Sequence, residues 1–372
     1  MKIAIDLRSL SGSRISGVEN YCLNLLENLP PKDLQNQYIF FYNSLRKRKL
    51  ADFHYVNSQI KDSGVPSKFL NLILKLNLMK LESIIGQVDW VFMPNLNQFS
   101  INPKTKLAIT VHDLSPLLTS EFYDFKRRLW HKFLNYKKAF HRANVLFAVS
   151  KHTKHALIKV FQLPEQKIQV IYPGVDTKSF HPNISQAQQR EIRNIYGLPG
   201  EFFLFLNTIE PRKNLANLIK AFEALSGKAW LVVAGRQGWK YKKVFQLIAK
   251  SKKREKIKYI GYIPEVHKPG LIKLAKALVY PSFYEGFGFQ PLEAMAVGTP
   301  VVASQLTAIP EVVADAGLLI NPYDVNSLTR ALQEISVNTA LRVMLVNKGF
   351  ERVEKFNWQE TARQIMQSFY KL

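Results

Sequence analysis

The sequence predicts an α/β protein with two doubly wound domains. Short apolar runs rich in β-branched and aromatic residues alternate with amphipathic stretches of helix length, which is typical of parallel sheets whose strands are connected by helices. At 372 residues the chain is long enough to bury two cores of ordinary size. A polar segment over residues 181–189 separates two series of these runs, and we place the domain boundary there.

Each series contains six runs that predict strands. In the first domain, residues 1–183, they are KIAID, YIFFYN, DWVFMPN, KLAITVHD, NVLFAVS and IQVIYPG. In the second, residues 184–355, they are FFLFLNT, AWLVVAG, IKYIGYI, ALVYPSF, PVVAS and GLLIN. Residues 356–372 predict a terminal helix. Doubly wound, Rossmann-like sheets bind ligands at the carboxyl ends of their strands, so we expect the two domains to face a central cleft that holds the site.

Composition indicates the surroundings in which the protein works. The single cysteine, Cys22, excludes an intramolecular disulfide, and the start MKIAIDLRSL has a strand pattern instead of an export signal. The most apolar stretch, residues 69–81, is interrupted by Asn and Lys and is too short to span a bilayer. We therefore expect a cytoplasmic protein.

A formal net charge of +24 attracts anionic partners such as nucleic acid, anionic lipid or an acidic substrate. The excess is divided almost evenly between the two halves and no nucleic-acid module is recognisable, so we expect no nucleic acid partner. The stretch FKRRLWHKFLNYKKAFHR allows two interpretations. Its stripe of Leu129, Phe133, Tyr136 and Phe140 favours a helix packed on the core, whereas its basic face favours peripheral contact with an anionic membrane on the inner face.

Two loops of the first domain follow predicted strands. Gly12 and Gly17 lie in SLSGSRISG, where glycines permit close backbone approach to a phosphate or sugar, although a flexible turn explains them equally well. His112 ends the strand in KLAITVHD, where its imidazole could bind a sugar hydroxyl. A single histidine at a strand end is more often structural.

In the second domain, FLNTIEPRKNLANLIKAF predicts a helix that begins at Pro211 and carries Arg212 and Lys213 in its first turn. Positive side chains oppose the helix dipole there, so a bound anion such as a pyrophosphate would explain them. A solvated basic turn is the alternative. The buried stripe of this helix is predicted to be Leu215, Leu218, Ile219 and Phe222.

The most specific segment is YPSFYEGFGFQPLEAMAVGTPVVAS. It predicts a strand, a glycine-containing turn and a helix opened by Pro291, with backbone N–H groups near Gly288 and Phe289 available to a ligand. Glu285 and Glu293 flank the turn and suggest two tasks, one at a sugar and one at a ribose diol. Each carboxylate also has an ordinary explanation, as a turn residue or as a complement to the helix dipole, but neither explains why all these residues occur together.

These motifs resemble glycosyltransferase family 4, the retaining enzymes of GT-B architecture, and in particular its mannosyltransferase-like group 1 members. The E-x7-E pattern stands in EGFGFQPLE. The segments DLRSLSGSRISGVENY, VHDLSP, VSKHTK, IYPGVD and IEPRKN occur in the family's order over nearly the whole chain. In many relatives a glycine at the strand end directly precedes the donor-binding arginine; here the strand end reads Asn207-Thr208.

The resemblance implies an acceptor-side first domain, a nucleotide-sugar-binding second domain and a terminal helix that crosses back to the first. It implies that Arg212 and Lys213 hold the donor diphosphate, that Glu293 holds the ribose and that Gly17 approaches the phosphates. The sugar would contact the remaining site residues, namely His112, Glu285, Gly288 and Phe289.

The implied activity is retaining transfer of a hexose, with mannose as our guess, from a nucleotide diphosphate sugar to a hydroxyl of a glycan or lipid-linked acceptor. His112, Glu285, Arg212 and Lys213 would act in catalysis. No DxD-like metal pair is evident, so we expect neither a metal nor a cofactor. A nucleotide-sugar epimerase or another GT-B-like enzyme is the alternative, and a basic nucleic-acid-binding protein is a remote one.

Overall fold

The computed structural model describes residues 1–11, 17–43, 53 and 55–372. Their contacts divide the chain into two units. The first unit contains residues 1–114, 129–174 and 357–372, and the second contains residues 115–128 and 175–356. The domain boundaries that the sequence predicts, after residues 183 and 355, stay predictions beside this division.

The first unit has a parallel sheet of seven strands in the order β3-β2-β1-β4-β5-β6-β7. The strands are β1 (Lys2–Asp6), β2 (Gln37–Tyr42), β3 (Ser58–Asp62), β4 (Trp90–Met93), β5 (Lys106–Val111), β6 (Val145–Ala148) and β7 (Ile168–Val170). All six strands predicted for this half are present. The edge strand β3 was not predicted, because SQIKD has one apolar residue and a largely exposed pattern.

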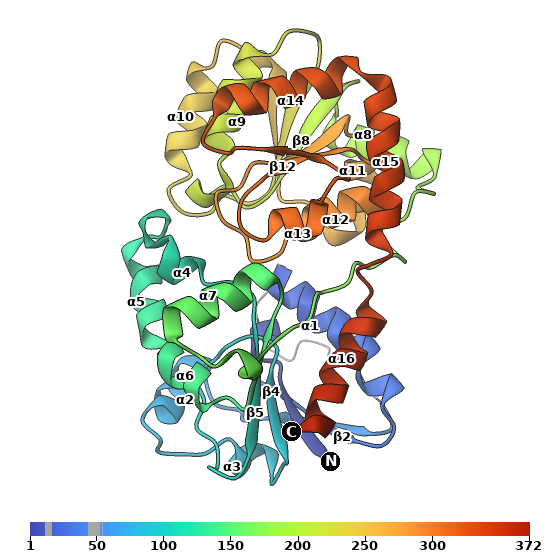
Figure 1. Ribbon diagram of the computed structural model, residues 1–372. Helices are drawn as coiled ribbons and strands as arrows, with labels where there is room; N and C mark the ends of the chain where they lie inside the picture. The colour runs from blue at the N-terminus through green and yellow to red at the C-terminus, as the bar shows by residue number, and fades with distance from the viewer. Residues whose placement is uncertain (12–16, 44–52, 54) are drawn as a thin grey trace. The chain divides into compact units, whose positions relative to one another are not determined.

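Helices cover both faces of this sheet (Figure 1). They are α1 (Gly17–Asn28), α2 (Ser67–Lys75), α3 (Glu82–Ile85), α6 (Tyr136–Arg142), α7 (Lys151–Phe161) and α16 (Trp358–Lys371), with 3₁₀ turns η1 (Arg8–Ser11), η2 (Pro30–Lys32) and η4 (Glu165–Lys167). On one face, α1 and α16 lie side by side, and the Phe369 ring of α16 packs on Trp90 at 5.1 Å between ring centroids.

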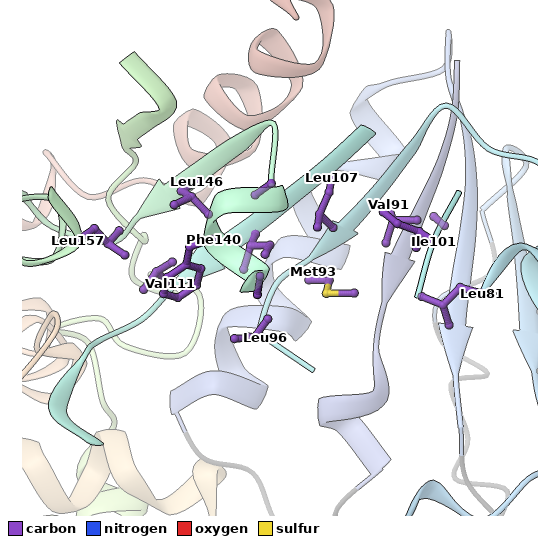
Figure 2. Packing of buried hydrophobic residues seen from close by; sticks show 14 of the residues in the cluster. Leu81, Val91, Met93, Leu96, Ile101, Leu107, Val111, Phe140, Leu146 and Leu157 are labelled. Atoms are coloured by element: carbon purple, nitrogen blue, oxygen red, sulfur yellow. The ribbon is translucent and has the colours of Figure 1, made fainter. Parts of the chain in front are cut away.

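The opposite face of the same sheet forms the apolar core shown in Figure 2. Val91, Met93 and Leu107 project from the strands, and Phe140 of α6 and Leu157 of α7 pack over them. All five side chains are buried. Because a parallel sheet is covered on both faces, its strands are apolar at almost every position, which is why the sequence reveals them.

The basic stretch that we predicted as one helix forms two, α5 (Phe125–Phe133) and α6, separated by Asn135 in a left-handed conformation. The buried stripe is right for Phe140, which is 1% exposed, and wrong for Leu129, which is 57% exposed. No residue of α5 is buried. The left-handed residue ends one helical register and starts another, so the stripe does not continue through both.

The second unit has a parallel six-stranded sheet in the order β10-β9-β8-β11-β12-β13. The strands are β8 (Phe202–Leu206), β9 (Trp230–Ala234), β10 (Ile257–Gly261), β11 (Ala277–Tyr280), β12 (Val301–Ser304) and β13 (Leu318–Ile320), and all six were predicted. Alternate residues such as Phe203 and Phe205 pack against helices on one face of the sheet.

The helices of this unit again form two layers. They are α8 (Gln186–Tyr196), α9 (Leu215–Ala224), α10 (Lys242–Lys250), α11 (Lys268–Lys273), α12 (Phe289–Ala296), α13 (Ile309–Val313), α14 (Val325–Val337) and α15 (Thr339–Val353), with 3₁₀ turns η5 (Pro211–Lys213), η6 (Arg254–Lys256) and η7 (Glu265–His267). In Figure 1, α9, α10 and α14 lie on one side of the sheet, and α11, α12 and α13 lie on the other.

Residues 115–128 belong to the second unit by their contacts, although both flanking segments belong to the first. They include α4 (Ser115–Leu118), η3 (Ser120–Phe122) and the start of α5. The Trp239 indole N–H donates to the carbonyl of Phe122 at 2.5 Å, and its ring stacks on Tyr123. The Phe122 ring stacks on Phe283 at 5.5 Å. This segment is therefore packed into the unit by aromatic rings.

None of the helices in the described part of the chain combines the length and hydropathy that crossing a bilayer requires.

Candidate functional site

The predicted site residues of the second unit lie where the order of the strands in its sheet reverses. From β8 the chain continues to β9 and β10 on one side, and then returns to place β11, β12 and β13 on the other. β8 and β11 are therefore neighbours whose carboxyl ends lead into different loops. Such a switch point is where open parallel sheets bind ligands.

After β8, the chain forms the short turn η5 before α9 begins. Asn214 separates the two at φ 60°, and its side-chain amide donates to the carbonyls of Pro281 and Pro322 at 3.0 and 2.8 Å. The prediction of one helix from Pro211 is therefore wrong, because a left-handed residue interrupts it. The predicted stripe of Leu215, Leu218, Ile219 and Phe222 is buried in α9.

Arg212 and Lys213 lie in η5 and bind the carboxylate of Glu285 from the loop after β11. Lys213 Nζ is 2.6 Å from Glu285 Oε1, and Arg212 Nη1 is 3.1 Å from Glu285 Oε2. Arg212 also pairs with Glu210 at 2.8 Å and donates to the carbonyl of Tyr284. Each of these four charged side chains belongs to a residue that is at least nine-tenths buried. Two cations and two carboxylates thus form one compact buried cluster.

The cluster shifts the pKa values of its members in opposite directions. Burial raises the pKa of Glu210, and burial together with the nearby Arg212 lowers the pKa of Lys213. Burial also opposes ionisation of Glu285, but attraction by Lys213 and Arg212 outweighs it and lowers the pKa of Glu285 to about 2. Glu285 therefore remains a carboxylate at any physiological pH, and the positive side chains are held in place by it.

Glu293 lies in α12, in a different environment. The residue is 6% exposed, and among the described residues its Oε2 atom has no hydrogen-bond partner. Burial raises its pKa to about 7, although Lys268 attracts the ionised form. Lys268 itself forms an ion pair with Glu265 at 2.6 Å. This carboxyl group is therefore poised to change its protonation state near neutral pH.

The turn before α12 has the backbone that glycine makes possible. Gly288 has φ 137°, and an added Cβ would lie 2.9 Å from Ile309 Cδ1. The helix begins at Phe289 rather than at Pro291, which corrects the predicted start by two residues. The Glu285 backbone N–H donates to Thr307 Oγ1 at 3.1 Å, so the loop after β12 supports this turn.

The remaining predicted residues lie in the first unit. His112 follows β5 and is partly buried; its Nε2 lies 2.8 Å from the Pro94 carbonyl, and its ring packs against Tyr21. Burial lowers the pKa of His112, so the neutral ring donates through Nε2 and presents Nδ1 as an acceptor. Gly17 is the exposed first residue of α1. Gly12 lies outside the described residues.

Sequence reasoning gave no role to two residues that the structure brings to the site. Glu210 belongs to the segment FLNTIEPRKNLANLIKAF. Its place between a predicted strand and two cations is the signal in the sequence that points to it. Lys268 has no motif around it, and only the packing of α11 against α12 brings its charge near Glu293. Within the described residues, no group of three or more His, Cys, Asp or Glu side chains is arranged to hold a metal ion.

The two parallel sheets, and the buried cation pair at the switch point of the second, can now be compared with known protein families. Residues 188–352 match the model described as glycosyl transferases group 1, and residues 15–179 match glycosyltransferase family 4. The chain belongs to this glycosyltransferase family and has its GT-B fold. It is a glycosyltransferase.

Individual proteins show the same relationship. O-antigen chain mannosyltransferase B of Escherichia coli is 31% identical over 269 residues, which cover 71% of this chain and 70% of that protein. Sucrose-phosphate synthase of Thermosynechococcus elongatus has the same fold, with a TM-score of 0.77 and 21% identity over 100% of this chain and 98% of that one. Anabaena HepE, solved with UDP and glucose, matches with a TM-score of 0.74 and 17% identity over the full length of both chains.

Proposed function

We propose that this glycosyltransferase transfers a hexose, with mannose as the first candidate, from a nucleotide diphosphate sugar to a hydroxyl of a glycan or lipid-linked acceptor. The observation that carries the proposal is the pair of buried cations, Arg212 and Lys213, at the sheet's switch point. The similarity to an O-antigen mannosyltransferase supports mannose and polysaccharide synthesis. The complex of HepE with UDP and glucose supports a nucleotide donor.

In this proposal the donor spans the loops after β8 and β11. Arg212 and Lys213 bind the diphosphate, and Glu293 accepts hydrogen bonds from the ribose diol. The sugar contacts Glu285, Gly288 and Phe289 from the second unit. For the first unit we propose that His112 contacts the sugar and that Gly17 approaches the phosphates.

We also propose that transfer retains the anomeric configuration and uses neither a metal nor another cofactor. As the glycosidic bond breaks, negative charge accumulates on the leaving diphosphate. Fixed positive side chains stabilise such charge well because they need no reorganisation during the reaction. Arg212 and Lys213 are fixed in this way by Glu285 and Glu210.

Calorimetric binding of UDP, GDP, ADP and dTDP, each with and without EDTA, tests the donor class. We expect one nucleotide to bind equally well in both conditions, followed by sugar transfer from the corresponding nucleotide hexose with the anomeric configuration retained by NMR. Failure of all four to bind would contradict the proposal. Release of an altered sugar without acceptor would favour an epimerase instead.

Peripheral contact with an anionic membrane is a further part of the proposal, and α5 supports it. Leu129 is 57% and Trp130 is 45% exposed, and the helix also carries Lys126, Arg128 and Lys132. An exposed aromatic and aliphatic surface with basic neighbours suits the interface of an anionic leaflet. Such contact would bring the enzyme to a lipid-linked acceptor on the inner face of the membrane.

Sedimentation with phosphatidylglycerol vesicles tests this contact. We expect binding at low salt that weakens as salt increases, and weaker binding by the double variant Leu129→Ser/Trp130→Ser. The matched control is Val337→Ser/Val343→Ser, which removes two exposed apolar side chains, 67% and 56% exposed, from the second unit. No sedimentation at low salt, or equal loss in both double variants, would contradict membrane contact through α5.

A further inference from the structure

Asn207 stands at the end of β8, at the place where the sequence departs from the family's glycine. The residue is 5% exposed, and its side-chain Nδ2 has no hydrogen-bond partner among the described residues. An unpaired buried amide destabilises a folded protein by about 1–3 kcal/mol. A group left in this state at the switch point of a sheet calls for a partner outside the chain.

The backbone around Asn207 is fixed by its neighbours. Its N–H donates to the carbonyl of Ala234 at 3.0 Å, which extends the pairing of β8 with β9. Gly235 has φ 133°, and a Cβ there would lie 1.8 Å from the Asn207 carbonyl oxygen. Only glycine permits this approach, so the end of β9 packs directly against the Asn207 backbone at the carboxyl edge of the sheet.

The same loop then carries the cations. Ile209 donates to the carbonyl of Arg236, which ties the loop to the end of β9, and Arg212 and Lys213 follow in η5. Their positive charges are already balanced by the carboxylates of Glu210 and Glu285. A neutral N–H donor on the same loop would add a hydrogen bond to an anionic ligand without placing another charge in a buried cluster.

We propose that Asn207 Nδ2 donates a hydrogen bond to an oxygen of the donor diphosphate. Asn207 is then a further diphosphate-binding residue of the second unit, in addition to Arg212 and Lys213. The assignment rests on the proposed function, since it places a nucleotide diphosphate at the end of β8. It also explains why a buried amide stands where it has no hydrogen-bond partner in the described part of the chain.

The decisive variant is Asn207→Leu, which replaces the amide with an apolar group of similar size. We expect the Kd of the nucleoside diphosphate to rise about tenfold or more, the loss expected for a hydrogen bond to a charged group. At the same time the Tm should rise, because the unpaired buried amide is removed. Binding of the corresponding nucleoside, which lacks phosphates, should not change.

Asn214→Leu is the matched control for stability. Asn214 is an equally buried asparagine on the same segment, but its amide has two carbonyl partners and its φ is positive. Its replacement should lower the Tm. A Tm that rises in Asn207→Leu and falls in Asn214→Leu would distinguish an amide that serves a ligand from one that stabilises the fold.

Three outcomes would overturn the inference. Unchanged diphosphate affinity in Asn207→Leu, while Arg212→Ala no longer binds, would remove Asn207 but leave the donor site in place. An equal loss with nucleoside and with diphosphate would assign the amide to the base or ribose. Failure of the wild type to bind any of the four nucleotides would remove the proposed function together with this inference.

Discussion

Replacement of Arg212 by alanine is expected to reduce kcat/KM for the nucleotide sugar by about a hundredfold or more, the usual loss when one fixed stabiliser of developing charge is removed. The change should also lower the free energy of unfolding by about 3–5 kcal/mol, because it leaves the carboxylates of Glu210 and Glu285 buried with one cation, Lys213, between them. Steady-state transfer rates and urea unfolding measure the two effects.

A second change separates stability from activity. Adding Glu210→Gln to Arg212→Ala removes one uncompensated charge, so it should restore part of the stability but none of the activity. Arg352→Ala is the control, because Arg352 is a partly buried arginine of the same unit that, within the described residues, donates to the carbonyls of Val312 and Glu311 and forms no ion pair. Transfer by Arg212→Ala at the rate of Arg352→Ala would show that Arg212 has no role in the site.

Donor affinity is expected to increase as pH rises through 7. The pKa of Glu293 is about 7 because the carboxyl group is buried, and its ionised form accepts hydrogen bonds from the two hydroxyls of a ribose more strongly than its neutral form does. If the ionised form alone binds, affinity should improve about tenfold between pH 6 and pH 8, as the ionised fraction grows. Calorimetry with an intact nucleotide sugar is the suitable measurement, because its diphosphate does not titrate near neutral pH.

The same group should make the fold less stable as pH rises from about 4.5 to 7. In this window the unfolded chain releases the proton of Glu293 while the folded chain keeps it, so the unfolded state is favoured by increasing pH. In Glu293→Gln, neither donor affinity nor the free energy of unfolding should show this dependence on pH. Lys268→Met removes the charge that favours ionisation and should move the affinity increase to higher pH. A pH profile of binding that is identical in wild type and Glu293→Gln would refute this assignment.

The strands were predictable because both faces of each sheet are covered. Runs such as FFLFL and WLVVA are apolar throughout, as expected for parallel strands that are covered on both faces. The edge strand β3 was missed because its residues are largely exposed, so its sequence, SQIKD, contains no apolar run. The break at Asn135 was also hidden, because the apolar residues on both sides of Asn135 keep helical spacing along the sequence.

The candidate site was predictable as a set of residues but not as a set of contacts. Spacing brought Glu285 and Glu293 together as a motif, yet their pKa values move in opposite directions because only Glu285 meets two cations. Arg212 and Lys213 were expected to await an external anion. The structure pairs them with Glu285 from the loop after β11, a contact that depends on β8 and β11 becoming neighbours.

Because residues 115–128 belong to the second unit, they restrict how hybrid enzymes can be built. A hybrid of two relatives can be made by splicing at a single junction near the middle of the chain. Here such a splice would supply Trp239 and Phe283 from one parent and their ring partners, Tyr123 and Phe122, from the other. A working hybrid should therefore take residues 115–128 and residues 175–356 from the same parent.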